Sequence, residues 1–575
     1  MGIIAPMDDS KRNKIERLKL AQSPCDYFEK LSALEGSKLS EADRFYLKNF
    51  GIYNHKLTPD RFTLRLRILG GRLGLRSLDA VYRFVQRHGA EAVVTSRAQL
   101  ELHGLDGPLV MEAFDALPSW GLESWQTYTD NFRNIVCDPL DGLLAPDVSE
   151  AMRAMEAVFL RKCDYVGMLP RKFNTAITAV AAPIVSFFGN DLFFAPSKKG
   201  DMEGFDLFVG GKNSHAARPL DRFVPPDRVV EVFTAVAEFY RAHGPRSSRS
   251  KARLYHMLEA MGAEAFAQAL DREVPGLSDG GEVRLIKRER DWPVPTGDGR
   301  FVHRYLSDFG RLRARQMAEI VALGERYGIE EIRLGCDQHL YLPGLPERIT
   351  YERSHSLNPK ILACVGARHC VYALSETKEE SARLDSQKLS TAGLRVGFSG
   401  CLKGCARHAF ADIGFVGIRT KLYGAEVERG VRLYLGAGYT RGERAGRLIL
   451  YAVPMRWVNR MVDLIVDLYE RSGYEDFERW ALERIDAMSE PAIAFWLLYH
   501  LHRRHVVRRE RWLALAKAPV GDEKAFFLRQ LEATDEEDAR IGALLRQEEA
   551  FAFREAIVYL ERACFRKRKG KDKVK

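Results

Sequence analysis

Residues 70–105, GGRLGLRSLDAVYRFVQRHGAEAVVTSRAQLELHGL, have a counterpart much later in the chain. Residues 309–345 read FGRLRARQMAEIVALGERYGIEEIRLGCDQHLYLPGL, and Gly-Arg-Leu, Gly and Gln recur in both segments at one constant offset. In each segment, apolar residues at helical spacing end at a glycine and are followed by two strand-like stretches. Chance similarity of two helix–strand units is the alternative, but the constant offset favours duplication. The sequence therefore predicts a pseudo-twofold chain.

Composition indicates a globular protein with several cores. The chain has 575 residues, of which 46% are hydrophobic and 29% charged, with a formal net charge of +10. A basic surface favours anionic ligands or acidic partners. The N-terminus has no apolar run of signal-peptide length, and the apolar run at 491–499 is shorter than the roughly 20 residues that a membrane span needs. We expect a soluble, cytoplasmic protein that does not bind membranes.

Four of the nine cysteines lie between residues 364 and 405, as Cys364-x5-Cys370 and Cys401-x3-Cys405. In a reducing compartment, such crowding favours metal or cluster ligation over disulfides. Four thiolates can hold a tetrahedral zinc ion or an iron–sulfur cluster. The five-residue gap is wide for a structural zinc site, which favours a cluster. Spacing alone also leaves open four unrelated buried cysteines.

The residues around the second cysteine pair favour a cluster further. Residues 399–417, SGCLKGCARHAFADIGFVG, contain Gly400, Gly404, Gly414 and Gly417. Glycine permits close approach of the backbone and leaves amide N–H groups accessible to cluster sulfides.

Taken with four further motifs, this pattern resembles the siroheme-dependent nitrite/sulfite reductase family. The resemblance covers roughly residues 45–485, and the motifs follow in the order and at about the distances of that family: TSRAQLELHG (95–104), DNFRNIVCDP (130–139), LPRKFNTAI (169–177) and FDLFVGGK (205–212). It implies an α/β (α+β) fold with two ferredoxin-like halves and two lobes that bind siroheme and a [4Fe–4S] cluster. The repeats correspond to the two halves.

The expected organisation has six parts. They are an N-terminal segment (1–58), the first ferredoxin-like half (59–124), the first reductase lobe (125–290), the second half (291–350), the second lobe with the cysteines (351–486) and a helical basic extension (487–575).

The resemblance also implies roles for individual residues. Cys364, Cys370, Cys401 and Cys405 would bind the cluster, and Cys405 would also be the axial ligand of the siroheme iron. Arg97, Arg133 and Lys172 would contact the substrate anion, since Arg and Lys supply positive charge and hydrogen-bond donors. Arg171 would pair with a siroheme carboxylate, and Arg65 and Arg67 are weaker candidates for the same role.

Asn174 bears on the choice of substrate. A strand over 169–180 would place residues 172 and 174 on one face. Sulfite-reducing members of the family have a second Lys at this position, whereas nitrite-reducing members have Asn. Because nitrite carries one negative charge and sulfite is largely a dianion near neutral pH, Asn174 favours nitrite.

The residues between the last two cysteines depart from the family. Family members commonly have Pro-Asn there, and this chain has Leu402-Lys403. An apolar residue and a cation beside the cluster could change its reduction potential or its contact with the haem. Lys403 could instead point outward toward the electron donor.

Together these features predict a six-electron reduction of nitrite to ammonium. No flavin or nicotinamide fingerprint is present, so we expect reduced ferredoxin or a similar carrier protein as the donor. The first alternative is assimilatory sulfite reduction to sulfide. A second is a precorrin-modifying monooxygenase of the same superfamily, which does not use siroheme as a cofactor. A third, a zinc-stapled domain that binds nucleic acid, leaves the Arg and Lys motifs unexplained, and we expect no nucleic-acid partner.

Overall fold

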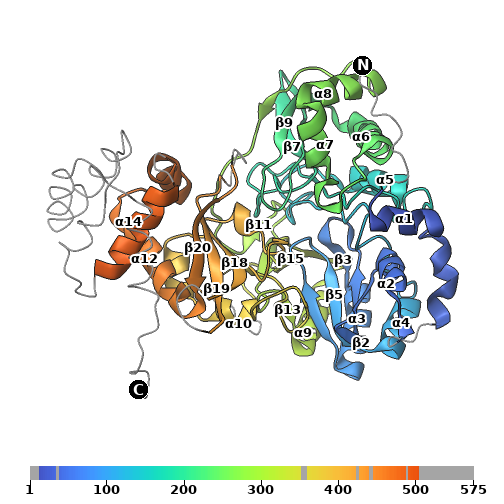
Figure 1. The fold of residues 1–575 in the computed structure, drawn as a ribbon, viewed down its shortest axis with the longest axis horizontal. Coiled ribbons are helices and arrows are strands. Elements are labelled where there is room, and N and C mark those ends of the chain that lie inside the picture. Colours follow the sequence, from blue (N-terminus) through green and yellow to red (C-terminus); the bar gives the residue numbers. More distant parts are fainter. Residues whose placement is uncertain are drawn as a thin grey trace. The chain divides into compact units, whose positions relative to one another are not determined.

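The computed structural model divides the chain into two compact units, Met1–Ser356 with Thr440–Glu443 and Leu357–Tyr439 with Arg444–Lys575 (Figure 1). It describes residues 12–33, 38–350, 359–421, 426–438, 444–486 and 490–503. Of the expected extension at 487–575, only helix α14 (Glu490–Arg503) is described, and the rest lies outside the described residues.

The first unit contains the two predicted repeats, and both fold as expected. The first repeat forms α3 (Leu75–His88), β4 (Glu91–Val94) and β5 (Leu100–Leu105). The second forms α9 (Ala314–Tyr327), β14 (Glu331–Leu334) and β15 (Leu340–Leu345). Gly89 and Gly328 end the two helices in the left-handed conformation, with φ of 64° and 69°. The predicted duplication is confirmed.

The two halves exchange a short strand. One sheet has the order β1-β2-β5-β4-β13 and the other β11-β12-β15-β14-β3, so β3 (Arg72–Gly74) joins the second half and β13 (Arg311–Leu312) joins the first. A Cβ at Gly71 would lie 2.2 Å from the Leu334 carbonyl oxygen, and one at Gly310 would lie 2.5 Å from that of Val94. The repeated glycines are therefore required by the exchange.

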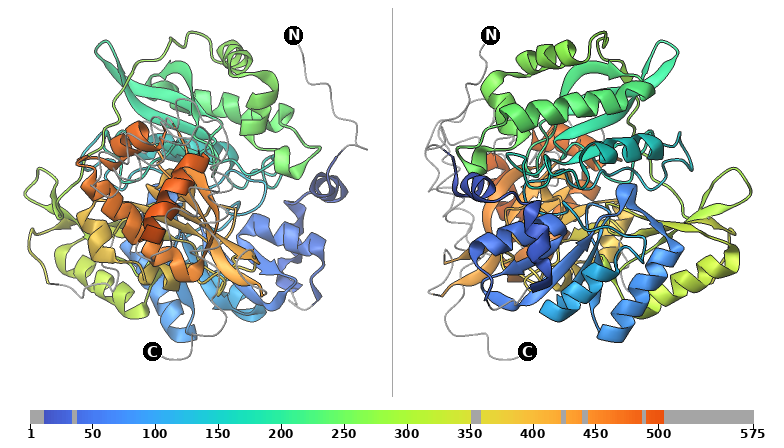
Figure 2. Two further views of the ribbon diagram at one scale, coloured as in Figure 1. Left: turned by 60° about the vertical axis from the view of Figure 1, so that its left-hand side comes forward. Right: turned by 90° about the vertical axis from the view of Figure 1, so that its right-hand side faces the viewer.

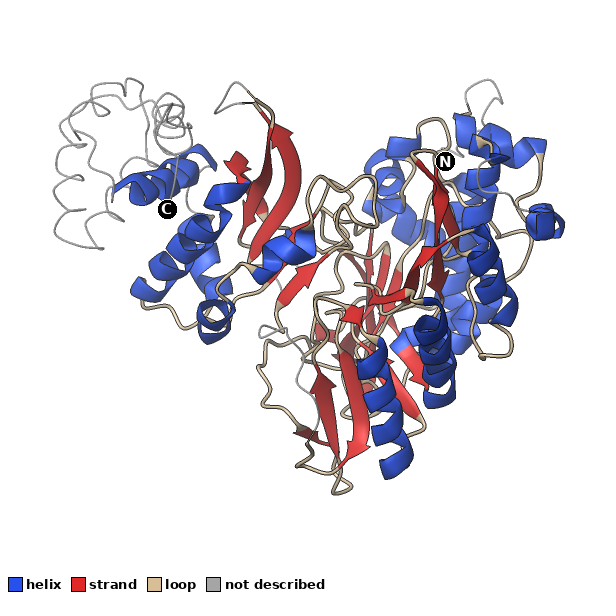
Figure 3. Ribbon diagram, turned by 90° about the horizontal axis from the view of Figure 1, so that it is seen from below, coloured by secondary structure: helices blue, strands red, loops and turns tan. Residues whose placement is uncertain are grey.

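Helices α3 and α9 pack against each other beside these strands (Figure 3). The other elements of the two sheets and the helix that follows β5 are β1 (Ile52–His55), β2 (Thr58–Leu66), β11 (Val294–Pro295), β12 (Phe301–Tyr305) and α4 (Gly107–Ala116).

A third sheet carries the part of the first unit between the halves. Its order is β10-β7-β8-β9, and β6 pairs with β7 in parallel. Helices pack with this sheet around one apolar core (Figure 2). The elements are β6 (Thr175–Ile177), β7 (Leu192–Lys199), β8 (Met202–Val209), β9 (Arg218–Val224), β10 (Glu282–Val283), α5 (Ser149–Phe159), α6 (Val229–His243), α7 (Leu254–Met261) and α8 (Ala263–Glu273).

The strand predicted over 169–180 is confirmed only for Thr175–Ile177 and is wrong for the residues on either side. Strand β6 begins only at Thr175, and before it Phe173 makes an isolated bridge with Phe132. Both rings are buried in the core, with centroids 5.1 Å apart. Packing of this aromatic pair, rather than a continuous ladder, therefore fixes the segment that carries Lys172 and Asn174.

The N-terminal residues pack on the first unit through α1 (Lys14–Ala21) and α2 (Glu41–Leu47). A 3-10 turn between them, Asp26–Ala33, follows Cys25, which forms a disulfide with Cys163. This disulfide was not predicted, because its cysteines are 138 residues apart and neither belongs to the four-cysteine group.

The second unit is built on one mixed sheet of order β16-β17-β18-β19-β20. The first three strands are parallel, and the others are antiparallel. The strands are β16 (Ile361–Ala363), β17 (Val396–Ser399), β18 (Ile413–Thr420), β19 (Glu428–Leu435) and β20 (Arg447–Pro454). The helices are α10 (Thr377–Ala382), α11 (Ser386–Thr391), α12 (Val458–Arg471) and α13 (Phe477–Trp480).

No helix among the described residues has both the length and the apolar character needed to cross a membrane.

Candidate active site: a cysteine group and a cluster of guanidinium groups

The cysteines lie where the parallel strands β16 and β17 end. Cys364 follows β16 directly, and one residue, Gly400, separates Cys401 from the end of β17. The Cys364 N–H donates to the Phe398 carbonyl at 3.2 Å, and the Gly400 N–H donates to Cys364 Sγ at 3.2 Å. Because parallel strands end at the same edge of a sheet, one cysteine of each pair is brought to a common site.

Glycines permit this close packing. A Cβ at Gly400 would lie 2.6 Å from Ala373 Cβ and 3.3 Å from Cys364 Sγ. At Gly417 it would lie 2.7 Å from the Gly400 carbonyl oxygen, and at Gly414 it would lie 2.0 Å from that of His408. The backbone around the second cysteine pair thus has no room for larger residues, in agreement with the glycine pattern of the sequence.

The thiols affect one another electrostatically. Burial raises the pKa of Cys370, and the negative charges of Cys364 and Cys401 raise it further. Burial also raises the pKa of Cys401. In the part of the chain that the structure describes, no three His, Cys, Asp or Glu side chains converge as around a single ion.

A second group of candidate residues, a set of guanidinium side chains, lies within the first unit. Burial lowers the pKa of the Arg133 guanidinium well below its ordinary value, and repulsion by three neighbouring cations lowers it further. These cations are Arg65, Arg171 and Arg97. The structure therefore brings together four arginines that the sequence singled out.

Each of these arginines is held by contacts within the unit. Arg133 donates to the carbonyls of Thr127 and Thr129, the latter at 2.8 Å. Arg97 lies between β4 and β5 and donates to Asn190 Oδ1 at 3.1 Å and to the Asn134 carbonyl at 3.0 Å. The guanidinium groups thus have set positions before any anion arrives.

Arg65 is fixed from three sides. Its guanidinium pairs with buried Glu101, donates to the Thr127 carbonyl at 3.1 Å and lies 3.8 Å above the centre of the Tyr128 ring. The Tyr128 hydroxyl donates to the same carboxylate at 2.9 Å. Burial would raise the pKa of Glu101, but Arg65 and His103 hold it well below its ordinary range, so the carboxylate stays ionised.

Arg67 differs from the others. Its side chain is buried and donates to the carbonyls of Trp125, Gln126 and Phe132, with distances of 2.9–3.2 Å, and it also pairs with Glu156. These contacts tie β2 to the following segment.

Asn174 is buried, and Lys172 is half-buried. Among the described residues, no hydrogen-bond partner reaches Asn174 Oδ1 or Arg133 Nε, although both atoms are buried. Buried polar atoms normally have partners. The unused N–H of Arg133, which lies beside other cations, fits a place that receives an anionic ligand.

Two buried carboxylates that the sequence did not single out hold the 171–174 segment. Asp130 pairs with Arg171 at 3.2 Å, Arg249 at 2.6 Å and Lys19 at 3.0 Å. Asp191 accepts the backbone N–H of Asn174 at 2.7 Å and pairs with Arg253 at 2.7 Å. Single acidic residues have no spacing pattern that would reveal such a role. Asp130 appeared in the sequence only as the first residue of the motif DNFRNIVCDP.

Comparison with known proteins identifies the family. The model for the nitrite and sulphite reductase 4Fe-4S domain matches residues 128–276 and 357–490, and that for the nitrite/sulfite reductase ferredoxin-like half domain matches 55–118 and 293–348. The ferredoxin–nitrite reductase of Synechococcus elongatus is 30% identical over 76% of this chain and 93% of its own length. The chain belongs to the nitrite and sulphite reductase family.

Other members of this family support the assignment. The chloroplastic ferredoxin–nitrite reductase of Oryza sativa subsp. japonica is 28% identical, over 81% of this chain and 86% of its own. The solved structure of the Mycobacterium tuberculosis NirA protein has a TM-score of 0.74 and 23% identity, and covers 82% of this chain and 96% of its own, which confirms the predicted fold.

As a family member, the protein is an oxidoreductase with a [4Fe–4S] cluster and siroheme as cofactors, as predicted. The residues present fit both groups. The four cysteines supply thiolates, and the Gly400 N–H already donates to Cys364 Sγ. The arginines around Arg133 supply cations for the carboxylates of siroheme.

Proposed function

We propose that this protein reduces nitrite to ammonium with six electrons from reduced ferredoxin or a similar carrier. Its relatives in Synechococcus elongatus and Oryza sativa are named ferredoxin–nitrite reductases. The family as a whole includes enzymes for two anions, so the choice of nitrite over sulfite rests on this chain's own residues.

The observation that carries the proposal is the set of guanidinium side chains around buried Arg133. Arg133 is buried and is repelled by Arg65, Arg171 and Arg97, although Glu101 and Asp130 offset the charges of Arg65 and Arg171. A small anion relieves both costs, because it supplies opposite charge and accepts the unused N–H of Arg133. We assign anion binding to Arg97, Arg133 and Lys172.

Asn174 supports nitrite. Its side chain is buried and neutral at the position where a second cation would favour a dianion. With one cation fewer, the site suits a monoanion. The amide can donate one hydrogen bond to an oxygen of the substrate.

When bound, siroheme and the cluster supply the electrons and the iron at which the anion is reduced. We propose Cys364, Cys370, Cys401 and Cys405 as cluster ligands, with Cys405 shared with the siroheme iron, and Arg65 and Arg171 as partners of siroheme carboxylates. The chain's own contribution is to fix these cations through hydrogen bonds and ion pairs. Overall, nitrite takes up six electrons and eight protons and yields ammonium and two water molecules.

The kind of electron donor that we propose follows from the net charge of the protein. With a formal net charge of +10, the protein attracts an acidic carrier, and opposite charges raise the rate of encounter. We propose the cytoplasm as the compartment, and we propose no nucleic-acid or membrane partner.

Steady-state kinetics of the holoenzyme test this function. With reduced ferredoxin, catalytic efficiency should be higher for nitrite than for sulfite, and ammonium should accumulate at one mole per mole of nitrite. A higher efficiency for sulfite, with sulfide as the product, would overturn the proposal in favour of sulfite reduction.

A further inference from the structure

Lys403, in the Leu402-Lys403 pair between the last two cysteines, makes a definite contact in the structure. The ammonium group of Lys403 lies 3.0 Å from the centre of the Tyr372 ring. Lys403 is two residues from both Cys401 and Cys405, and Tyr372 is two residues from Cys370. The contact therefore joins the two loops that carry the cysteine pairs.

This contact holds a positive charge beside the thiolates. An ammonium over an aromatic face is attracted by the negative face of the ring, which restricts an otherwise flexible side chain. The ammonium group therefore lies on a loop between Cys401 and Cys405 and against a ring two residues from Cys370. The same charge acts on any anionic centre that these thiolates hold.

We propose that Lys403, held over the Tyr372 ring, raises the reduction potential of the [4Fe–4S] cluster. The inference rests on the proposed cysteine ligation. A cluster gains one negative charge when it accepts an electron, so a nearby fixed cation stabilises the reduced form more than the oxidised form. The cluster is then easier to reduce by a ferredoxin than it would be with a neutral residue at position 403.

Two other roles for Lys403 predict different results. If Lys403 only ties the loops together, its removal should lower iron content. If it only contacts the electron donor, its removal should raise the KM for ferredoxin and leave the potential unchanged. A role in setting the potential is the only one of the three that moves the potential at constant iron content.

The experiment is an EPR-monitored redox titration of the purified holoenzyme. Lys403→Gln removes the charge, Lys403→Arg keeps it, and Tyr372→Leu removes the ring while leaving the lysine. Iron, acid-labile sulfide and the KM for ferredoxin are measured on the same preparations. We expect the midpoint potential of Lys403→Gln to be more negative than that of the wild type at equal iron content. Lys403→Arg should match the wild type, and Tyr372→Leu should lie between the wild type and Lys403→Gln.

An unchanged midpoint potential in Lys403→Gln would overturn the proposal, whatever happens to the KM. Loss of iron from both Lys403→Gln and Tyr372→Leu would also overturn it, in favour of a purely structural contact. These failures are distinct from failure of the proposed function. A wild-type protein without a [4Fe–4S] EPR signal would contradict the cofactor assignment itself.

Discussion

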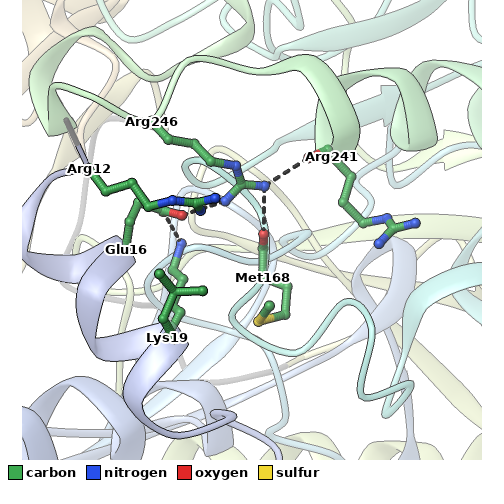
Figure 4. Close-up of a pocket in the computed structure, with 7 residues that line it drawn as sticks. Arg12, Glu16, Lys19, Met168, Arg241 and Arg246 are labelled. Carbon is green, nitrogen blue, oxygen red and sulfur yellow. Dashed lines mark hydrogen bonds and ion pairs between the residues drawn. The ribbon is translucent and has the colours of Figure 1, made fainter. Parts of the chain in front are cut away.

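Asp130 provides a quantitative test of how the first unit holds its arginines. Its carboxylate is fully buried and contacts three cations, of which Lys19 is buried and Arg171 and Arg249 are about one-third exposed. The Lys19 ammonium has three acceptors: Asp130, Glu16 at 2.5 Å and the Leu169 carbonyl at 2.7 Å. Figure 4 shows Lys19 and Arg246 on either side of Glu16.

Asp130→Asn removes the negative charge while keeping the shape. Removing one partner of a buried ion pair costs about 3–5 kcal/mol. Because Arg171 and Arg249 can reach water and Lys19 keeps Glu16, we expect about 3 kcal/mol, the lower end of that range. Urea unfolding followed by circular dichroism at pH 7 measures this loss.

The double variant Lys19→Met/Asp130→Asn tests the mechanism. It removes the buried cation as well as the anion. The double variant should therefore lose less free energy of unfolding than the two single variants together, by about 1–3 kcal/mol. Strict additivity would refute a direct pairing of these residues. A loss below about 0.5 kcal/mol for Asp130→Asn, typical of a surface substitution, would refute the burial argument.

The pH dependence has a definite sign. Burial alone would raise the pKa of Asp130, but the charges of Lys19, Arg249 and Arg171 hold it well below its ordinary range. The stabilisation is therefore present above the unfolded value of about 4 and is lost as the pH falls below it. The wild type and Asp130→Asn should differ most near neutral pH and converge in acid.

Three further substitutions have defined outcomes. Asn174→Lys adds a cation at the anion site and should shift the sulfite-to-nitrite ratio of catalytic efficiencies by about tenfold toward sulfite, equivalent to about 1.4 kcal/mol; an unchanged ratio would count against the assignment. Glu101→Gln leaves Arg65 without its carboxylate, so siroheme content should fall and stability should drop by about 2 kcal/mol, measured by haem absorption and urea unfolding. Gly400→Ala places a methyl group 2.6 Å from Ala373 Cβ, so it should lower the iron content and reduce the free energy of unfolding by about 1–3 kcal/mol. Gly74→Ala, whose added methyl group would lie 3.6 Å from its nearest neighbour, should do neither. Equal iron content in both variants would contradict the packing argument.

The sequence predicted the parts of the fold that depend on repeated local patterns. Helix periodicity, the terminating Gly89 and Gly328 and the constant offset together indicated two equivalent halves. The strand exchange through Arg72–Gly74 and Arg311–Leu312 was not predicted, because the pairing of such short strands depends on tertiary packing.

The sequence singled out candidate site residues where they belong to spaced motifs. The cysteines and the arginines of the quoted motifs lie in ordered groups, and the resemblance supplied their roles. The supporting carboxylates Asp130, Asp191 and Glu101 were missed, because their role depends on cations up to 119 residues away in the sequence. The hydrogen bonds from the buried Arg67 guanidinium to backbone carbonyls could not be predicted from the sequence either.

The most direct test of the account is the metal content of the purified protein and of its Cys405→Ser variant. The wild type should contain about five iron atoms and four acid-labile sulfides per chain, together with siroheme absorption bands. Cys405→Ser should lose the cluster, and Cys137→Ser, at a buried cysteine outside the ligand group, should retain it. Zinc without iron in the wild type, or full iron and sulfide in Cys405→Ser, would contradict the central claim.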